Sequence, residues 1–113
     1  MNNPPLTHRE LEVFLTSKPT VRYSDDAQKY RGVASEFLLE ERGLTITFTW
    51  ISIGGRLHSD HRAIFPDPRV VSNENDILVV RHAGGKDVFI TNLASHKFAA
   101  LQEKGRIEKE FHH

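Results

Sequence analysis

The stretch LTITFTWISIGGRLHSDHRA, residues 44–63, decides the fold. Apolar and threonine side chains alternate in its first half, which is typical of a β-strand with one buried face. We expect that buried face to carry Leu44, Ile46, Phe48 and Trp50. The pair Gly54-Gly55 then predicts a two-residue hairpin turn into a second strand. The turn sets Ser52 opposite Leu57, Trp50 opposite Ser59, and Phe48 opposite His61.

The segment before this stretch, residues 33–39, also alternates and predicts the preceding strand. A turn over residues 40–43 brings Leu39 opposite Leu44 and extends the pairing to Val33 opposite Trp50. The three strands then form an antiparallel sheet with one apolar face.

A third hairpin is predicted around Gly84-Gly85, between residues 77–82 and 87–90. Its turn pairs Val80 with Phe89 and His82 with Asp87. Both faces near its base are apolar, so each face needs a cover, which a helix or a second subunit supplies. A symmetric homodimer is therefore expected, and the alternative is that residues 20–31 fold over the patch.

Two helices are expected at the ends of the chain. Thr7 and Glu10 have the spacing of a capping box, which predicts a helix over residues 8–17 that stops before Pro19. A second helix is predicted over residues 93–104, with Gly105 as its stop. The expected fold class is α+β: a curved antiparallel meander sheet of five or six strands, with an N-terminal and a C-terminal helix packed on it.

The composition bounds the class of protein. The 113 residues suit a single domain, residues 1–113, in which His112 and His113 resemble the remains of a purification tag. Fifteen basic and fifteen acidic residues give a net charge of +0, which argues against nucleic-acid binding. No apolar run is long enough to cross a membrane, and the lack of cysteine favours a cytoplasmic protein.

The cluster of His58, Asp60 and His61 has the residue types of a metal site. On a regular strand, however, His58 and Asp60 point to one side and His61 to the other. These side chains then cannot converge on one ion, so neither a metal nor a cofactor is expected.

The candidate ligand-binding residues are His61, Trp50, Phe48, Ser59 and Ser52. In the predicted register they share one face, and an aromatic wall with a few inward polar groups is typical of small-molecule pockets. An imidazole in such a pocket acts as a hydrogen-bonding group or as a general base.

The functional hypothesis is a non-enzymatic binding or protein-interaction module. The alternative is a small-ligand pocket enzyme, an isomerase or hydrolase, that uses His61 as its acid/base with Ser59 and Ser52 as helpers. Neither glycine pair leads from a strand into a helix, so neither is a phosphate-binding loop.

Overall fold

A computed structural model of the chain describes residues 3–26, 28–52 and 54–103. It contains seven strands, which all belong to one antiparallel sheet. The strands are β1 (Thr20–Ser24), β2 (Lys29–Glu40), β3 (Gly43–Ile51), β4 (Leu57–Phe65), β5 (Arg69–Glu74), β6 (Ile77–Arg81) and β7 (Asp87–Thr91). The helices are short: α1 (His8–Leu11), the 3-10 turn η1 (Glu12–Phe14) and α2 (Ser95–Glu103).

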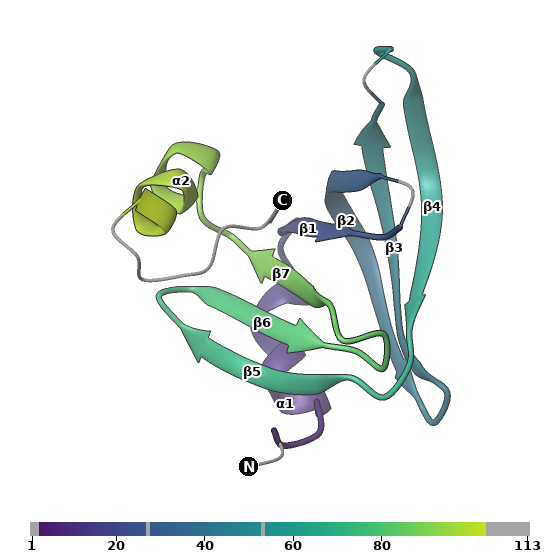
Figure 1. The fold of residues 1–113 in the computed structure, drawn as a ribbon, viewed down its shortest axis with the longest axis vertical. Coiled ribbons are helices and arrows are strands. Elements are labelled where there is room, and N and C mark those ends of the chain that lie inside the picture. The colour runs from purple at the N-terminus through teal and green to yellow at the C-terminus, as the bar shows by residue number, and fades with distance from the viewer. Residues whose placement is uncertain (1–2, 27, 53, 104–113) are drawn as a thin grey trace.

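The strand order is β4-β3-β2-β1-β7-β6-β5. The sheet therefore consists of two hairpin-linked groups, β1 to β4 and β5 to β7, joined where Thr20 in β1 pairs with Thr91 in β7. The chain passes directly from β4 to β5, the two outermost strands (Figure 1). The backbone N–H of Ala83, in the β6–β7 turn, donates to the carbonyl of Pro66, in the β4–β5 connection, at 2.8 Å. This bond ties the two groups together a second time.

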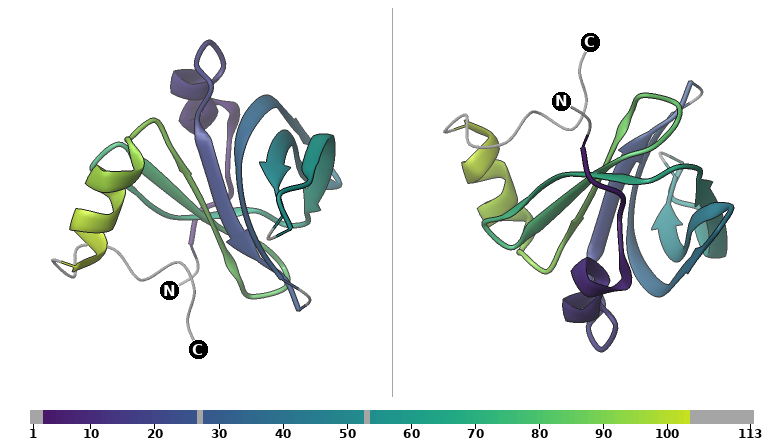
Figure 2. Two further views of the ribbon diagram at one scale, coloured as in Figure 1. Left: turned by 90° about the horizontal axis from the view of Figure 1, so that it is seen from above. Right: turned by 90° about the horizontal axis from the view of Figure 1, so that it is seen from below.

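The main core fills the inner side of this bent sheet. Leu11 from α1 and Phe14 from η1 are buried in it, and the ring centroids of Phe14 and Phe37 lie 6.4 Å apart. Figure 2 shows the purple N-terminal helical segment between the two groups of strands. The fully buried strand residues include Val21, Leu44, Ile46, Phe48, Leu78, Val80, Val88 and Ile90.

A second, smaller core lies on the outer side of β6 and β7. Phe98 of α2 packs there against Ile77, Val79 and Phe89. The guanidinium carbon of the buried Arg22 lies 4.0 Å from the centroid of the Phe98 ring. Figure 1 shows α2 beside this group of strands, away from β2, β3 and β4.

The predicted α+β fold, with two helices on a meander of five or six strands, is wrong. The capping box of Thr7 and Glu10 is confirmed, since the Glu10 carboxylate accepts from the Thr7 backbone N–H at 2.8 Å. Yet the α-helix ends at Leu11 because the next turn is 3-10, and only Leu11 and Phe14 of this segment are buried. The second helix begins at Ser95, two residues later than expected, and extends to Glu103, the last described residue; its predicted stop at Gly105 lies outside the described residues, as do His112 and His113.

The β6–β7 hairpin pairs one residue out of the predicted register. Val79 pairs with Phe89 and Arg81 with Asp87, with an ion pair at 2.8 Å between Arg81 Nε and the Asp87 carboxylate. His82 therefore belongs to the turn. Val79 and Phe89 lie under α2, so the apolar surface that indicated a homodimer is covered within one chain.

Candidate functional site

The β3–β4 hairpin confirms the predicted register only in its lower half. Phe48 pairs with His61 as predicted, but Trp50 pairs with His58 rather than Ser59. At the tip, the backbone N–H of Ser52 donates to the carbonyl of Arg56 at 2.9 Å, so the turn is one residue longer than predicted.

A β-bulge reconciles the two halves. Ser59 and Asp60 together lie opposite Thr49, and Asp60 adopts a left-handed φ of 54°. The extra residue turns His58 onto the same face as His61, so the prediction that these imidazoles point in opposite directions is wrong. Within residues 3–26, 28–52 and 54–103, no group of three or more histidines and carboxylates is arranged to hold a metal ion.

Both imidazoles join a cluster of aromatic rings. His58 stacks on Trp50 with centroids 4.2 Å apart and planes 10° apart. His61 meets the edge of Phe48 at 5.0 Å and lies roughly parallel to Tyr30 at 5.6 Å. The aromatic wall predicted beside His61 is therefore present, with Tyr30 as an additional member.

An open cleft of about 390 Å³ lies next to His61, between the two groups of strands. It is bounded by β4, by the β1–β2 turn and by the β6–β7 turn. The lining residues are Tyr23, Ser24, Asp25, Asp26, Tyr30, His61, Ala63, Ile64, Phe65, His82, Gly84 and Lys86. It is the place in the described chain where aromatic rings and two imidazoles line the same hollow.

His82 occupies the cleft in a defined protonation state. Burial, with a contribution from the nearby Lys86 ammonium, lowers the pKa of His82 below its ordinary value, although Asp87 acts in the opposite direction. The backbone N–H of Gly84 donates to His82 Nδ1 at 3.1 Å. At neutral pH the ring is therefore neutral, and its one proton sits on Nε2.

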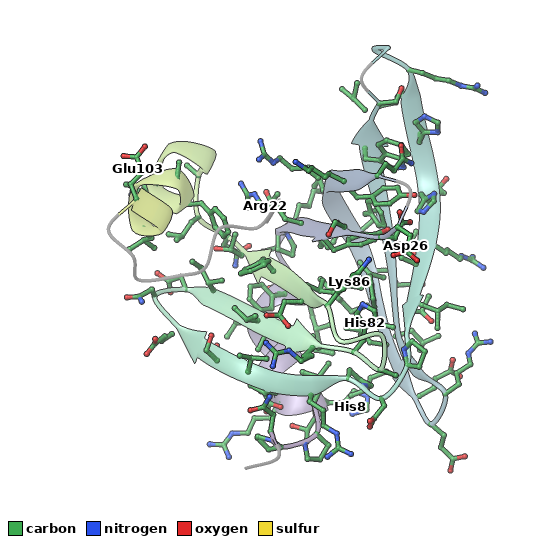
Figure 3. The ribbon with its side chains drawn as sticks, in the orientation of Figure 1. His8, Arg22, Asp26, His82, Lys86 and Glu103 are labelled. Atoms are coloured by element: carbon green, nitrogen blue, oxygen red, sulfur yellow. The ribbon has the colours of Figure 1, made fainter. Side chains whose placement is uncertain are left out.

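The rim of the cleft carries charge. The Lys86 ammonium donates to the Asp26 carboxylate at 2.8 Å, which links the β6–β7 turn to the β1–β2 turn (Figure 3). Deeper in the cleft, burial raises the pKa of the Tyr23 phenol, with Tyr30 and Asp25 contributing, so Tyr23 stays protonated and retains a hydroxyl proton.

The five predicted ligand-binding residues do not gather in this cleft. Only His61 lines it, while Phe48 is fully buried behind it. Ser59 is exposed at the bulge, and the Ser52 hydroxyl accepts from the Arg56 N–H at 3.3 Å at the hairpin tip. Trp50 lines a separate groove of about 590 Å³, together with Val33, Ile51 and Leu57 among others.

Sequence reasoning missed His82, Tyr23 and Lys86 as members of the site. Their only signal was that two polar turns, residues 24–28 and 82–86, both follow apolar strands.

No protein-family model, curated protein sequence or solved structure matches this chain. In the part of the chain that the structure describes, neither helix has the length and apolar character needed to span a bilayer.

The lowered pKa of His82 predicts a pH dependence of stability. The unfolded chain binds a proton at this imidazole more tightly than the folded chain does, so acid favours unfolding. We expect the free energy of unfolding to fall as the pH drops below about 6.5, the ordinary histidine value. Urea denaturation at about pH 7.5 and about pH 5.5 measures the fall. In His82→Gln the fall is expected to be smaller, and an equal fall in both proteins contradicts the assignment.

Proposed function

We propose that this chain is a non-enzymatic binding domain whose cleft takes a small, polar, ring-bearing molecule. The observation that supports the proposal most is the meeting of aromatic rings and two imidazoles, His61 and His82, around one open hollow of about 390 Å³. Small-molecule sites usually combine such an apolar wall with a few polar groups that set the orientation of the ligand.

The aromatic wall favours a flat ligand. Tyr23 stacks on Tyr30 with centroids 4.7 Å apart, and Phe65 meets Tyr23 edge-on at 5.0 Å. Rings held in this way keep their positions when a ligand binds, so little conformational entropy is lost. A planar molecule gains contact with a ring face or edge there.

The polar groups favour a ligand that accepts hydrogen bonds. The Nε2–H of the neutral His82 ring and the Tyr23 hydroxyl are donors, since the Nδ1 of His82 is already engaged by Gly84. The carboxylate and ammonium of Asp26 and Lys86 stand at the entrance, where they are paired with each other. A ligand with one polar edge and one apolar face satisfies both parts of the cleft.

The enzymatic alternative gains no support from the geometry. An isomerase or hydrolase that used His61 with Ser59 and Ser52 needs these hydroxyls beside the imidazole, yet neither serine lines the cleft that His61 lines. The cleft is also open, whereas an acid/base site is more effective when closure excludes water. We therefore keep binding as the proposed function. The cytoplasmic location stays a prediction.

Three probes that share a ring but differ in charge test the proposal: benzoate, indole and benzamidine. Each is titrated into isotopically labelled protein while backbone amide and histidine ring signals are followed by NMR. We expect at least one probe to shift the signals of Ser24, His82 and Gly84, which surround the cleft. The expected affinity is weak, with a Kd of about 1 mM, because the probes are small.

Two variants make the titration decisive. Tyr23→Leu removes the hydroxyl and one ring face, and is expected to weaken binding by about tenfold or more. Leu57→Ala alters the separate groove instead, and is expected to leave binding unchanged. Shifts that centre on Ile51 and Leu57, or no shifts with any probe, count against the cleft as the binding site.

A further inference from the structure

The outer face of β2, β3 and β4 carries several exposed apolar side chains, and α2 packs on β6 and β7 instead. Cross-strand partners share a face, so the pairing shows which residues lie on this outer side. Five large apolar side chains there are between 45% and 64% exposed: Val33, Leu38, Ile51, Leu57 and Ile64. Exposed apolar residues gathered on adjacent strands are typical of an interface.

Short side chains divide this outer face along its middle. Thr45, Thr47 and Thr49 lie on this face of β3, the central strand of the three. Thr45 and Thr47 are only 7% and 9% exposed. Longer side chains flank them on both sides. Leu38 of β2 and Ile64 of β4 both pair with Thr45, and Glu36 of β2 and Arg62 of β4 both pair with Thr47.

The flanking charges are opposite in sign. Glu36 and Arg62 are exposed, and neither forms an ion pair among the residues that the structure describes. They lie in the central row of the face, each about 4.8 Å to one side of β3. Across the three strands this row is Glu36, Thr47 and Arg62. A rotation of the sheet by a half-turn about an axis parallel to β3 exchanges the positions of the acidic and the basic residue.

We propose that this outer face binds a second copy of the chain about a two-fold axis parallel to β3. The rotation places β2 over the partner's β4. Glu36 then faces Arg62 of the partner subunit, and Leu38 faces Ile64 of the partner subunit. Each of these contacts occurs twice, as an isologous interface requires.

Two further observations favour a second copy as the occupant. The exposed Leu38 and Ile64 flank the buried Thr45, so they can fill the space of about 10 Å that separates the two sheets of a β-sandwich. The net charge of +0 means that two copies do not repel each other as wholes. This inference does not rest on ligand binding in the cleft, which shares only Ile64, at its edge on β4, with the residues named on the outer face.

The expected dimer is weak. Three strands that are about 4.8 Å apart and about 30 Å long present a flat area of roughly 400 Å² per copy, which does not include the extra surface of protruding side chains. That area is below the roughly 800 Å² per partner of standard interfaces, so the dimer dissociates on dilution. Sedimentation is expected to show a mass that rises from 12.9 kDa toward twice that value as the concentration increases.

Charge reversal tests the arrangement. Glu36→Arg and Arg62→Glu each place like charges opposite one another, and each is expected to weaken dimerisation by about tenfold or more. The double variant Glu36→Arg/Arg62→Glu restores opposite charges and is expected to recover dimerisation. Lys18→Glu, at an exposed basic residue outside the strands, is the matched control and is expected to have no such effect. Both reversed residues are exposed, so all variants are expected to keep the native amide spectrum.

Three results overturn the proposal. The first is a monomer at every concentration. The second is a dimer that neither single reversal weakens, which places the interface on another surface. The third is a double variant no better than the single variants, which shows that Glu36 and Arg62 do not face each other across the axis.

Discussion

Gly43→Ala is expected to lower the free energy of unfolding by roughly 3–5 kcal/mol. Gly43 opens β3 at a φ of 135°, a conformation that residues with a side chain rarely adopt. A Cβ at this position would also press on the carbonyl oxygen of Phe65 and lie 2.9 Å from the Cα of Pro66. Both neighbours are backbone and cannot swing away. Urea denaturation measures the loss.

Two other glycines separate the two causes. Gly55→Ala introduces a side chain at a φ of 83° with no atom within 4 Å, so only backbone strain of about 1–2 kcal/mol is expected. Gly54→Ala meets open space without a left-handed φ, and is expected to be nearly neutral. If Gly43→Ala lowers the free energy of unfolding no more than Gly55→Ala does, the close approach of Phe65 to Gly43 is wrong.

Phe98→Ala is expected to destabilise the protein by roughly 3–5 kcal/mol. Phe98 is only 1% exposed and is the buried anchor of α2 on the outer core. Its ring also covers the guanidinium of the buried Arg22, so the truncation removes a cation–π contact as well as apolar area. Urea denaturation measures the global effect, and amide exchange along α2 reports whether the helix detaches.

Phe98→Leu tests how much of this effect depends on the ring. Leucine keeps most of the apolar cover and loses the contact with the cation, so an intermediate loss of stability is expected. Lys97→Ala, at the exposed neighbour on α2, is the control and is expected to change stability by less than about 0.5 kcal/mol. A similar loss in Phe98→Ala and Lys97→Ala contradicts the packing of α2 on β6 and β7.

The alternation in residues 44–50 was sufficient to predict β3 and its inner face. The pairs Leu39 with Leu44 and Phe48 with His61 are confirmed, because matching two apolar faces leaves one good register near the middle of a strand. Predictions failed toward the upper end of the same strands. There Gly32, not Val33, pairs with Trp50, and Val33 is 47% exposed on the outer face.

Two bulges explain these failures. One shifts the register between Ala34 and Glu36, and the other lies at Ser59 and Asp60. A bulge adds one residue and so reverses the face of every side chain beyond it. Asp60 was the only hint, because aspartate tolerates a left-handed φ better than most residues. Such a hint is too weak to place a bulge from sequence alone.

The cleft depends on a contact that no local pattern reveals. Tyr23 and His82 share the hollow because β1 pairs with β7, and these strands are far apart in the chain. Hydrophobic periodicity predicts strands and turns, but it contains no information on which distant strands become neighbours. His61 on β4 was therefore accessible to sequence reasoning, whereas Tyr23, His82 and Lys86 were not.

The order of the strands has a consequence for how the protein folds. Every pairing except one joins strands that follow each other along the chain, so two meanders can form early from local contacts. The exception is the pairing of β1 with β7, which closes a loop from Thr20 to Thr91. Closing this loop lowers the conformational entropy of the chain before the contacts between β1 and β7 can stabilise it. Refolding should therefore be limited by the docking of two preformed groups of strands, β1 to β4 and β5 to β7. A circular permutant whose chain begins between β4 and β5 would keep both groups intact.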